Sequence, residues 1–201
     1  MSLVGSFREQ MVFPRRIKAL CSHIAALLPP DATVLDVGCG EGALANMLIE
    51  ARADVSVAGI DVLVRPETLI PVLEFDGKTI PYADQSFDVV MLVDVLHHTT
   101  NQVQLLSEAR RVMRKAVVLK DHCRDGFLAN ATLRLMDWVG NAHHGVVLPY
   151  NYWSEAEWRQ TFAALRLEPE IWIAELGLYP WPFSAVFGRG LHFASRLIPR
   201  R

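Results

Sequence analysis

The sequence is poor in cysteine, in surplus basic charge and in long apolar runs. Its three cysteines are too few and too irregularly spaced for a disulfide framework, so they fit a reducing compartment such as the cytoplasm. With 20 basic and 22 acidic residues the formal charge is −2, which disfavours an electrostatic grip on nucleic acid. No apolar run approaches the roughly 20 residues that a membrane span needs, and the polar first ten residues are not typical of a signal peptide. We expect a cytoplasmic protein with no transmembrane segment that does not bind nucleic acid.

The length and composition suit one domain. A chain of 201 residues that is 51% apolar can bury a full core. We expect residues 1–201 to form a single domain, in which about residues 123–153 are an insertion of helix and loop.

The most informative stretch is Thr33-Val-Leu-Asp-Val-Gly-Cys-Gly-Glu-Gly-Ala43. A short β-rich apolar run precedes three glycines at alternate positions, and apolar residues then recur at helical spacing. The pattern predicts a strand, a tight turn and a helix. Without side chains, Gly38, Gly40 and Gly42 let a ligand approach bare backbone amides at the beginning of the helix.

Strand and helix patterns alternate along the chain. Apolar runs near residues 34–37, 55–60, 72–75, 87–95, 117–119, 167–176 and 191–198 predict strands, and helical spacing predicts helices over 14–28, 43–52, 102–113, 126–138 and 155–165. Such alternation indicates an α/β protein with a doubly wound, mostly parallel sheet.

Carboxylates follow the predicted strands. The five are Asp36, Asp61, Asp76, Asp94 and Asp121. Buried carboxylates are rare unless paired, and caps or turns explain only one or two of them. Since ligands of such sheets bind beyond the carboxyl ends of the strands, we expect the site there.

The glycine turn alone leaves the ligand open. Gly38-x-Gly40-x-x-Ala43 also satisfies the dinucleotide fingerprint, so an NAD-dependent oxidoreductase is an alternative, as is a turn without any ligand. A carboxylate at Asp36, two residues before the first glycine, would repel a pyrophosphate and attract an ammonium or sulfonium. The residues therefore favour a cationic ligand.

The motifs together resemble class I S-adenosylmethionine-dependent methyltransferases over about residues 33–120. Residues 33–43 resemble the first motif and Asp61-Val62 the second. Asp76-Gly77 with residues 80–88 is similar to the third motif of the small-molecule branch, and residues 92–98 resemble the fourth. The resemblance implies a Rossmann-like seven-stranded sheet with an antiparallel last strand.

The same resemblance implies S-adenosylmethionine as cofactor and a small-molecule methyl acceptor. Asp61 would accept both ribose hydroxyls, and Asp76 would accept from the adenine amino group. The cofactor-binding residues implied are Asp36, Gly38, Gly40, Gly42, Asp61, Val62, Asp76, Gly77 and Asp94. A domain that keeps this fold without catalysis is a further alternative.

An oxygen or sulfur acceptor would require a general base, and histidine is the usual one at neutral pH. His122, just past a predicted strand end, is the best placed; His97, His98, His143 and His144 are other candidates. We expect no metal site, because neighbouring strand residues such as Asp121, His122 and Cys123 point to opposite faces.

The insertion is rich in aromatic residues. Trp138, Tyr150, Tyr152 and Trp153 would bind a flat or apolar acceptor at the mouth of the site, or would pack the insertion onto the sheet. The sequence leaves these two roles equally open.

Overall fold

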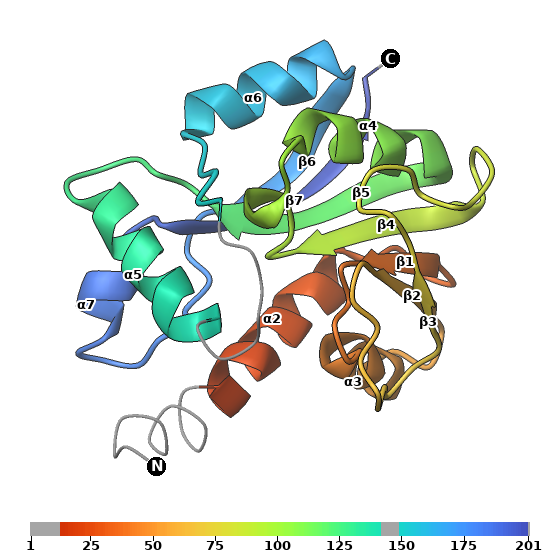
Figure 1. Ribbon diagram of the computed structural model, residues 1–201, viewed down its shortest axis with the longest axis horizontal. Helices are drawn as coiled ribbons and strands as arrows, with labels where there is room; N and C mark the ends of the chain where they lie inside the picture. Colours follow the sequence, from red (N-terminus) through yellow and green to blue (C-terminus); the bar gives the residue numbers. More distant parts are fainter. Residues whose placement is uncertain (1–12, 142–148, 201) are drawn as a thin grey trace.

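The computed structural model describes residues 13–141 and 149–200. Its centre is a seven-stranded sheet with the order β3-β2-β1-β4-β5-β7-β6 (Figure 1). The strands are β1 (Thr33–Val37), β2 (Ser56–Asp61), β3 (Val72–Glu74), β4 (Phe87–Val93), β5 (Met113–His122), β6 (Leu167–Ile173) and β7 (His192–Pro199). Strands β1 to β5 pair in parallel, and β7 lies antiparallel between β5 and β6. The predicted fold, including the antiparallel last strand, is confirmed.

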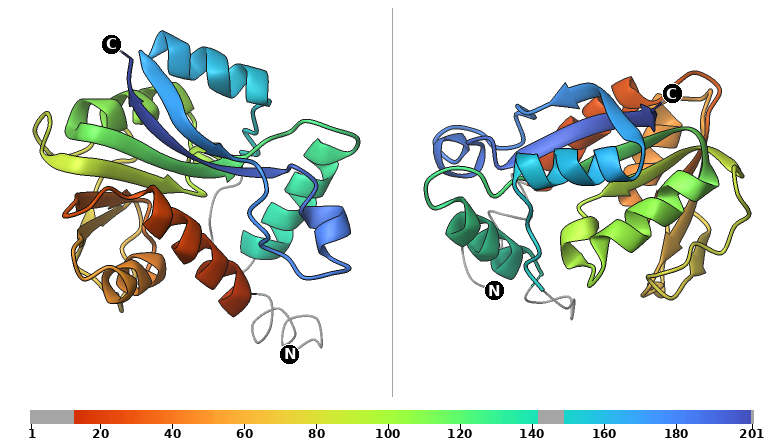
Figure 2. Two further views of the ribbon diagram at one scale, coloured as in Figure 1. Left: turned by 180° about the vertical axis from the view of Figure 1, so that it is seen from behind. Right: turned by 90° about the horizontal axis from the view of Figure 1, so that it is seen from above.

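Helices cover both faces of this sheet (Figure 2). Helices α2 (Phe13–Leu27) and α3 (Ala43–Ala51) pack on one face, where Ile24 and Leu48 join a cluster with Val34. Helices α4 (Gln102–Val112) and α6 (Glu155–Ala164) cover the other face, where Trp158 joins a cluster with Leu35. Because successive strand residues point to opposite faces, neighbouring residues of β1 feed both cores.

Strand β5 is much longer than the three apolar residues that predicted it. It continues through Lys120, Asp121 and His122, which are at most 3% exposed. These polar side chains interrupt the apolar pattern of the strand. A protein tolerates their burial because each has a hydrogen-bond partner. The apolar run of residues 117–119 therefore marked only the middle of the strand.

The connection between β2 and β3 is unusually simple. Its ten residues, 62–71, form no helix, whereas parallel neighbours are usually joined by a helical crossover. Leu69 N–H donates to the carbonyl oxygen of Glu41 at 2.8 Å, which holds the loop against the glycine turn. The loop thereby becomes part of the wall of the site.

The insertion carries α5 (Ala129–Asn141), beyond the end of the sheet and beside α7 (Ser184–Phe187) (Figure 1). Leu133 of α5 packs with Tyr152 and Leu191 in a small third cluster. The loop predicted over residues 141–153 falls partly outside the described residues. No helix within the described ranges is long and apolar enough to cross a bilayer.

Candidate functional site

The glycine turn leaves β1 at Val37 and leads into α3. Gly38 and Gly40 have φ values of 75° and 59°, in the left-handed region that favours glycine. A Cβ on Gly38 would lie 2.6 Å from Val95 Cγ2, so close packing requires glycine there. A Cβ on Gly40 would meet nothing within 4 Å. Gly40 therefore presents bare backbone to open space, and Gly42 follows as the N-cap of α3.

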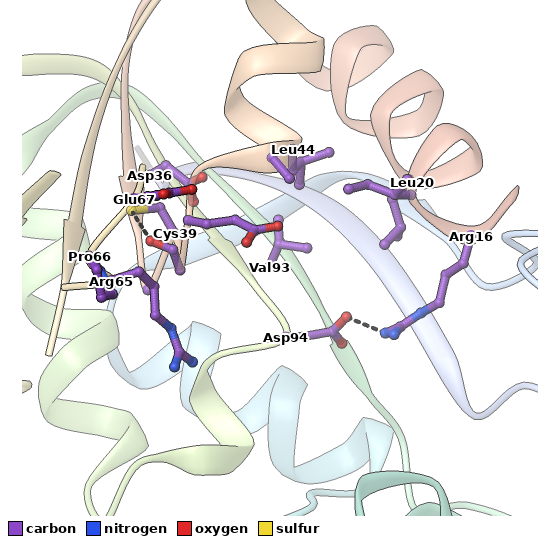
Figure 3. Close-up of a pocket in the computed structure, with 15 residues that line it drawn as sticks. Arg16, Leu20, Asp36, Cys39, Leu44, Arg65, Pro66, Glu67, Val93 and Asp94 are labelled. Carbon is purple, nitrogen blue, oxygen red and sulfur yellow. Dashed lines mark hydrogen bonds and ion pairs between the residues drawn. The ribbon is translucent and has the colours of Figure 1, made fainter. Parts of the chain in front are cut away.

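A cavity of about 660 Å³ opens beside this turn (Figure 3). It lies at the carboxyl ends of β1 and β4, with α2 on its other side. Among the predicted cofactor-binding residues, its lining includes Asp36, Gly38, Gly40 and Asp94. Apolar side chains of Leu20, Leu44 and Val93 complete much of the wall, so the cavity combines acids with apolar surface.

Asp36 is a deeply buried acid of the cavity. Its side chain is 3% exposed, and no other described side chain forms an ion pair or hydrogen bond with its carboxylate. Burial, followed by the negative charge of Asp61, raises the pKa of Asp36 to about 7. A positively charged ligand group would relieve both effects.

Asp61 supports the turn from the end of β2. Its Oδ2 accepts from Gly40 N–H at 2.8 Å and its Oδ1 accepts from Leu63 N–H at 2.9 Å. The carboxylate thus fixes the backbone that faces the cavity. Asp61 itself is not among the lining residues.

The structure does not bring every predicted residue to the cavity wall. Val62 is 55% exposed, and neither Asp76 nor Gly77 belongs to the lining. Asp76 Oδ1 accepts from the N–H groups of Lys78 and Thr79, at 2.8 and 2.7 Å, which lowers the pKa of Asp76. Its role toward adenine stays a prediction.

Asp94 closes the far side of the cavity. It adopts a φ of 58°, unusual for a residue other than glycine. Arg16 Nη2 of α2 lies 2.6 Å from Asp94 Oδ2, and Lys120 donates to Oδ1. Burial would raise the pKa of Asp94, but the charges of Lys120 and Arg16 outweigh it and lower the pKa.

Sequence reasoning missed Arg16 and the residues of the β2–β3 connection, Arg65, Pro66 and Glu67, all of which line the cavity. Arg16 reaches across from α2 to Asp94, 78 positions further along the chain (Figure 3). Its position off the apolar face of a predicted helix gave no sign of this contact. For the loop, a signal was present in the sequence: residues 62–71 show no helical spacing, so no crossover helix could be expected between β2 and β3.

His122, the predicted base, lies behind Asp94. It is 3% exposed and does not line the cavity; its Nδ1 is 3.7 Å from Asp94 Oδ1 and 3.4 Å from Asp121 Oδ1. Burial and the charges of Lys120 and His97 lower the pKa of His122 well below its usual value. The imidazole is therefore neutral at pH 7, and its role as base stays a prediction.

Cys123 does not join Asp121 and His122 as a potential ligand. Burial, followed by nearby acids, raises the pKa of the Cys123 thiol to about 12. Among the described residues, Cys123 belongs to neither group of side chains close enough to share a metal ion.

The structure bears on the packing role that the sequence offered for the aromatic residues of the insertion. Tyr152 is 5% exposed within the third cluster, and the Trp153 ring centroid lies 4.7 Å from that of Trp158. Both side chains pack the insertion. Trp138 is 59% exposed and does not line the cavity, so contact of these aromatic residues with an acceptor stays a prediction.

Comparisons with known proteins also point to a methyltransferase. Residues 35–119 match the family model described as a methyltransferase domain. An S-adenosylmethionine-dependent methyltransferase from Mesorhizobium loti superposes with a TM-score of 0.66 at 15% identity, over 90% of this chain and 97% of that one. At this identity the likeness shows the fold.

Two curated relatives carry functional names. The phthiotriol/phenolphthiotriol dimycocerosates methyltransferase of Mycobacterium leprae is 30% identical over 67% of this chain and 44% of its own length. The 27-O-demethylrifamycin SV methyltransferase of Amycolatopsis mediterranei is 33% identical over 47% of this chain and 40% of its own length. The chain thus spans less than half the length of these relatives.

The fold is that of class I methyltransferases, with a seven-stranded sheet and an antiparallel β7. Within it, residues 35–119 form a methyltransferase domain by the family match.

Proposed function

We propose that the chain is an enzyme that transfers a methyl group from S-adenosylmethionine to a small-molecule acceptor. The observation that carries the proposal is the cavity beside the glycine turn, where the buried Asp36 carboxylate forms no ion pair with a described side chain. The relatives named for dimycocerosates and a rifamycin support a small-molecule acceptor.

The residues present fit this cofactor. Asp36 would attract its cationic groups, while the bare backbone at Gly40 leaves room for close approach. Asp61 uses one lone pair on each oxygen for backbone amides, so further lone pairs remain for ribose hydroxyls. Asp76 engages only Oδ1 with described backbone groups, which leaves Oδ2 for the adenine amino group.

The cofactor would supply a methyl group already activated by its positively charged sulfur. The protein's task is then to align the acceptor and to exclude water. Leu20 and Leu44 provide apolar surface for exclusion of water, and α2 covers the cavity through the Arg16–Asp94 ion pair. An aromatic or apolar acceptor suits this lining. His122 would take the acceptor's proton if the target atom is oxygen or sulfur.

Two further aspects belong to this proposal. Residues 1–201 act as one domain, which the pairing of Cys123 with Trp153 and the Arg124–Glu157 ion pair support, since both join the two ends of the insertion. The enzyme works in the cytoplasm, which its three cysteines support, none of them in a disulfide.

Calorimetry with S-adenosylmethionine, followed by a transfer assay, tests the proposal. The labelled cofactor would be incubated with hydroquinones, phenols, amines and thiols, for wild type, Asp36→Asn and the control Asp84→Asn. Asp84 is exposed and precedes β4, away from the cavity. We expect binding and transfer in wild type and control, with both reduced in Asp36→Asn.

The alternatives predict other outcomes of the same experiment. An inert binding domain would bind the cofactor without turnover across the whole panel. An oxidoreductase would give no heat with S-adenosylmethionine and bind NADH tightly, which would overturn the proposed reaction.

A further inference from the structure

A second group of polar side chains lies beyond the cavity, where α5 meets η2 (Leu96–His98), the short helix after β4. One ring nitrogen of His97, one of His98 and a carboxylate oxygen of Asp137 all lie within 4.8 Å of one another. His97 and Asp137 are 1% and 7% exposed, and His98 is half-buried. None of the three lines the cavity, so the group is separate from the cofactor site.

The orientation of His97 is set by Asp121. His97 Nδ1 lies 2.7 Å from Asp121 Oδ1, and the Asp121 carboxylate also accepts from the N–H groups of Leu96 and His122 at 3.1 and 2.8 Å. Because the Asp121 carboxylate is the acceptor in these contacts, Nδ1 of His97 donates to it. The lone pair of the neutral ring is then on Nε2.

Nε2 of His97 faces Asp137. Its distance to Asp137 Oδ2 is 3.6 Å, too long for a good hydrogen bond but close to the spacing of two ligands on one metal ion. The Tyr152 hydroxyl donates to the same carboxylate and orients it. A histidine that donates one nitrogen to a carboxylate and offers the other is the usual arrangement around bound metals.

His98 adds an independent observation. Its Nδ1 is buried and has no hydrogen-bond partner among the residues that the structure describes. A buried polar atom without a partner costs about 1–3 kcal/mol. The tilted contact with the His97 ring, whose centroid lies 4.0 Å from that of His98, does not supply a hydrogen bond. A metal ion would satisfy this nitrogen.

We propose that His97, His98 and Asp137 bind a divalent transition-metal ion. Two imidazoles and one carboxylate suit zinc, iron or cobalt better than magnesium or calcium. The donors would draw in to bonds of about 2.0–2.2 Å. The ion would join α5 to the carboxyl end of β4, and three protein ligands leave a position for water.

The neighbouring trio of Asp94, His97 and His122 is also close enough to share an ion, but it is the poorer site. The Lys120 ammonium already bonds to Asp94 and would repel a second cation. His97 Nδ1 faces that trio but is engaged by Asp121, whereas Nε2 is directed at Asp137.

The test uses the full chain, free of affinity tags and stripped of metal with a chelator. Titration with cobalt(II) is followed by visible absorption, and zinc(II) is then added in competition. We expect one cobalt per chain, with absorption bands in the visible range that zinc abolishes.

Variants locate the site. His98→Gln and Asp137→Asn should weaken cobalt binding by on the order of 100-fold, and Asp121→Asn by about 10–100-fold, because Asp121 acts through His97. The control His23→Gln removes a histidine on α2 that bonds only to the Leu176 carbonyl oxygen among described groups, and should bind like wild type. Circular dichroism checks folding; if His98→Gln is unfolded, Asp137→Asn decides.

Two outcomes would overturn the site. The first is that wild type takes up no cobalt even at millimolar concentration, in which case a proton on His97 Nε2 bridges to Asp137. Alternatively, folded His98→Gln and Asp137→Asn could bind as tightly as wild type, which would show that cobalt binds elsewhere. Neither outcome depends on methyl transfer.

Discussion

At the scale of single residues, the main feature of the site is a pair of carboxylates that the protein shields from solvent in the absence of a ligand. Asp36 is 3% exposed and titrates near neutral pH, whereas Asp94 is paired with Arg16 and Lys120 and stays ionised. Two acids at neighbouring strand ends thus have different tasks. In the proposed function Asp36 binds a cationic group of the ligand, whereas Asp94 holds α2 beside the cavity through Arg16.

The affinity for S-adenosylmethionine should depend on pH through Asp36. A cationic ligand favours the ionised carboxylate, whose pKa without ligand is about 7. Below pH 7 a proton must leave on binding, so affinity should rise up to about tenfold per pH unit and level off above pH 7. Calorimetry from pH 5.5 to 8.5 measures this. Asp36→Asn should lack the rise, and a parallel rise in that variant would exclude Asp36 as its source.

Removing the Asp61 carboxylate tests the ribose assignment. Asp61→Ala should weaken cofactor binding by about 1–3 kcal/mol, through lost charge-assisted hydrogen bonds and a less rigid turn at Gly40. Asp61→Asn, which keeps one acceptor oxygen, should lose less. Equal affinity of wild type and Asp61→Ala would mean that the ribose lies elsewhere.

A side chain at Gly40 should fill the space of the ligand. Gly40→Val would strain a left-handed residue, at a cost of ~1–3 kcal/mol, and would project into open space beside the turn. Gly177 has a φ of 58° and equally open surroundings, yet does not line the cavity, so Gly177→Val is a control for strain. We expect that calorimetry detects no cofactor binding in Gly40→Val and normal binding in Gly177→Val.

At the scale of elements, local chemistry determines where helices begin. The Asn101 side chain accepts from Gln104 N–H at 3.1 Å at the start of α4, and Ser154 with Glu157 forms a capping box before α6. Both use residue types that favour the N-terminus of a helix. The two helices pack on one face of the sheet and hold the strands whose ends form the site.

The N-cap of α4 can be measured directly. Asn101→Ala should lower the free energy of unfolding by about 1 kcal/mol, because one helical N–H loses its acceptor. Asn101→Asp keeps an acceptor at the same place and should cost much less. Urea denaturation of the three proteins gives both values, and an equal loss in both variants would show that the amide group matters for another reason.

At the scale of the whole molecule, α6 connects the helical layer on one face of the sheet to the buried polar residues at the end of β5. Trp158 is fully buried, packs on Trp153 and Phe193, and donates from Nε1 to the backbone oxygen of His122 at 2.9 Å. One side chain thus joins the insertion, the last strand and the end of β5. This hydrogen bond links the packing of α6 to the position of His122 in the sheet.

Trp158→Ala should therefore destabilise the protein by about 3–5 kcal/mol, since it opens a cavity and removes a donor. Trp181 is 84% exposed, so Trp181→Ala should change stability by no more than about 0.5 kcal/mol. Urea denaturation compares the two. Similar stabilities would mean that the layer on this face contributes little to folding.

The sequence by itself determined the alternation of strands and helices, the glycine turn and the row of acids. These features depend on residues close together in the sequence: the spacing of apolar residues, and the backbone conformations that only glycine adopts easily. Only the tertiary structure decided which acids meet the cavity: Asp36 and Asp94 line it, while Asp76 does not. It also brought Arg16 to Asp94 and buried Lys120 and His122 in a longer β5. Such contacts join residues far apart in sequence, so they arise only when packing supplies the partners that make polar burial tolerable.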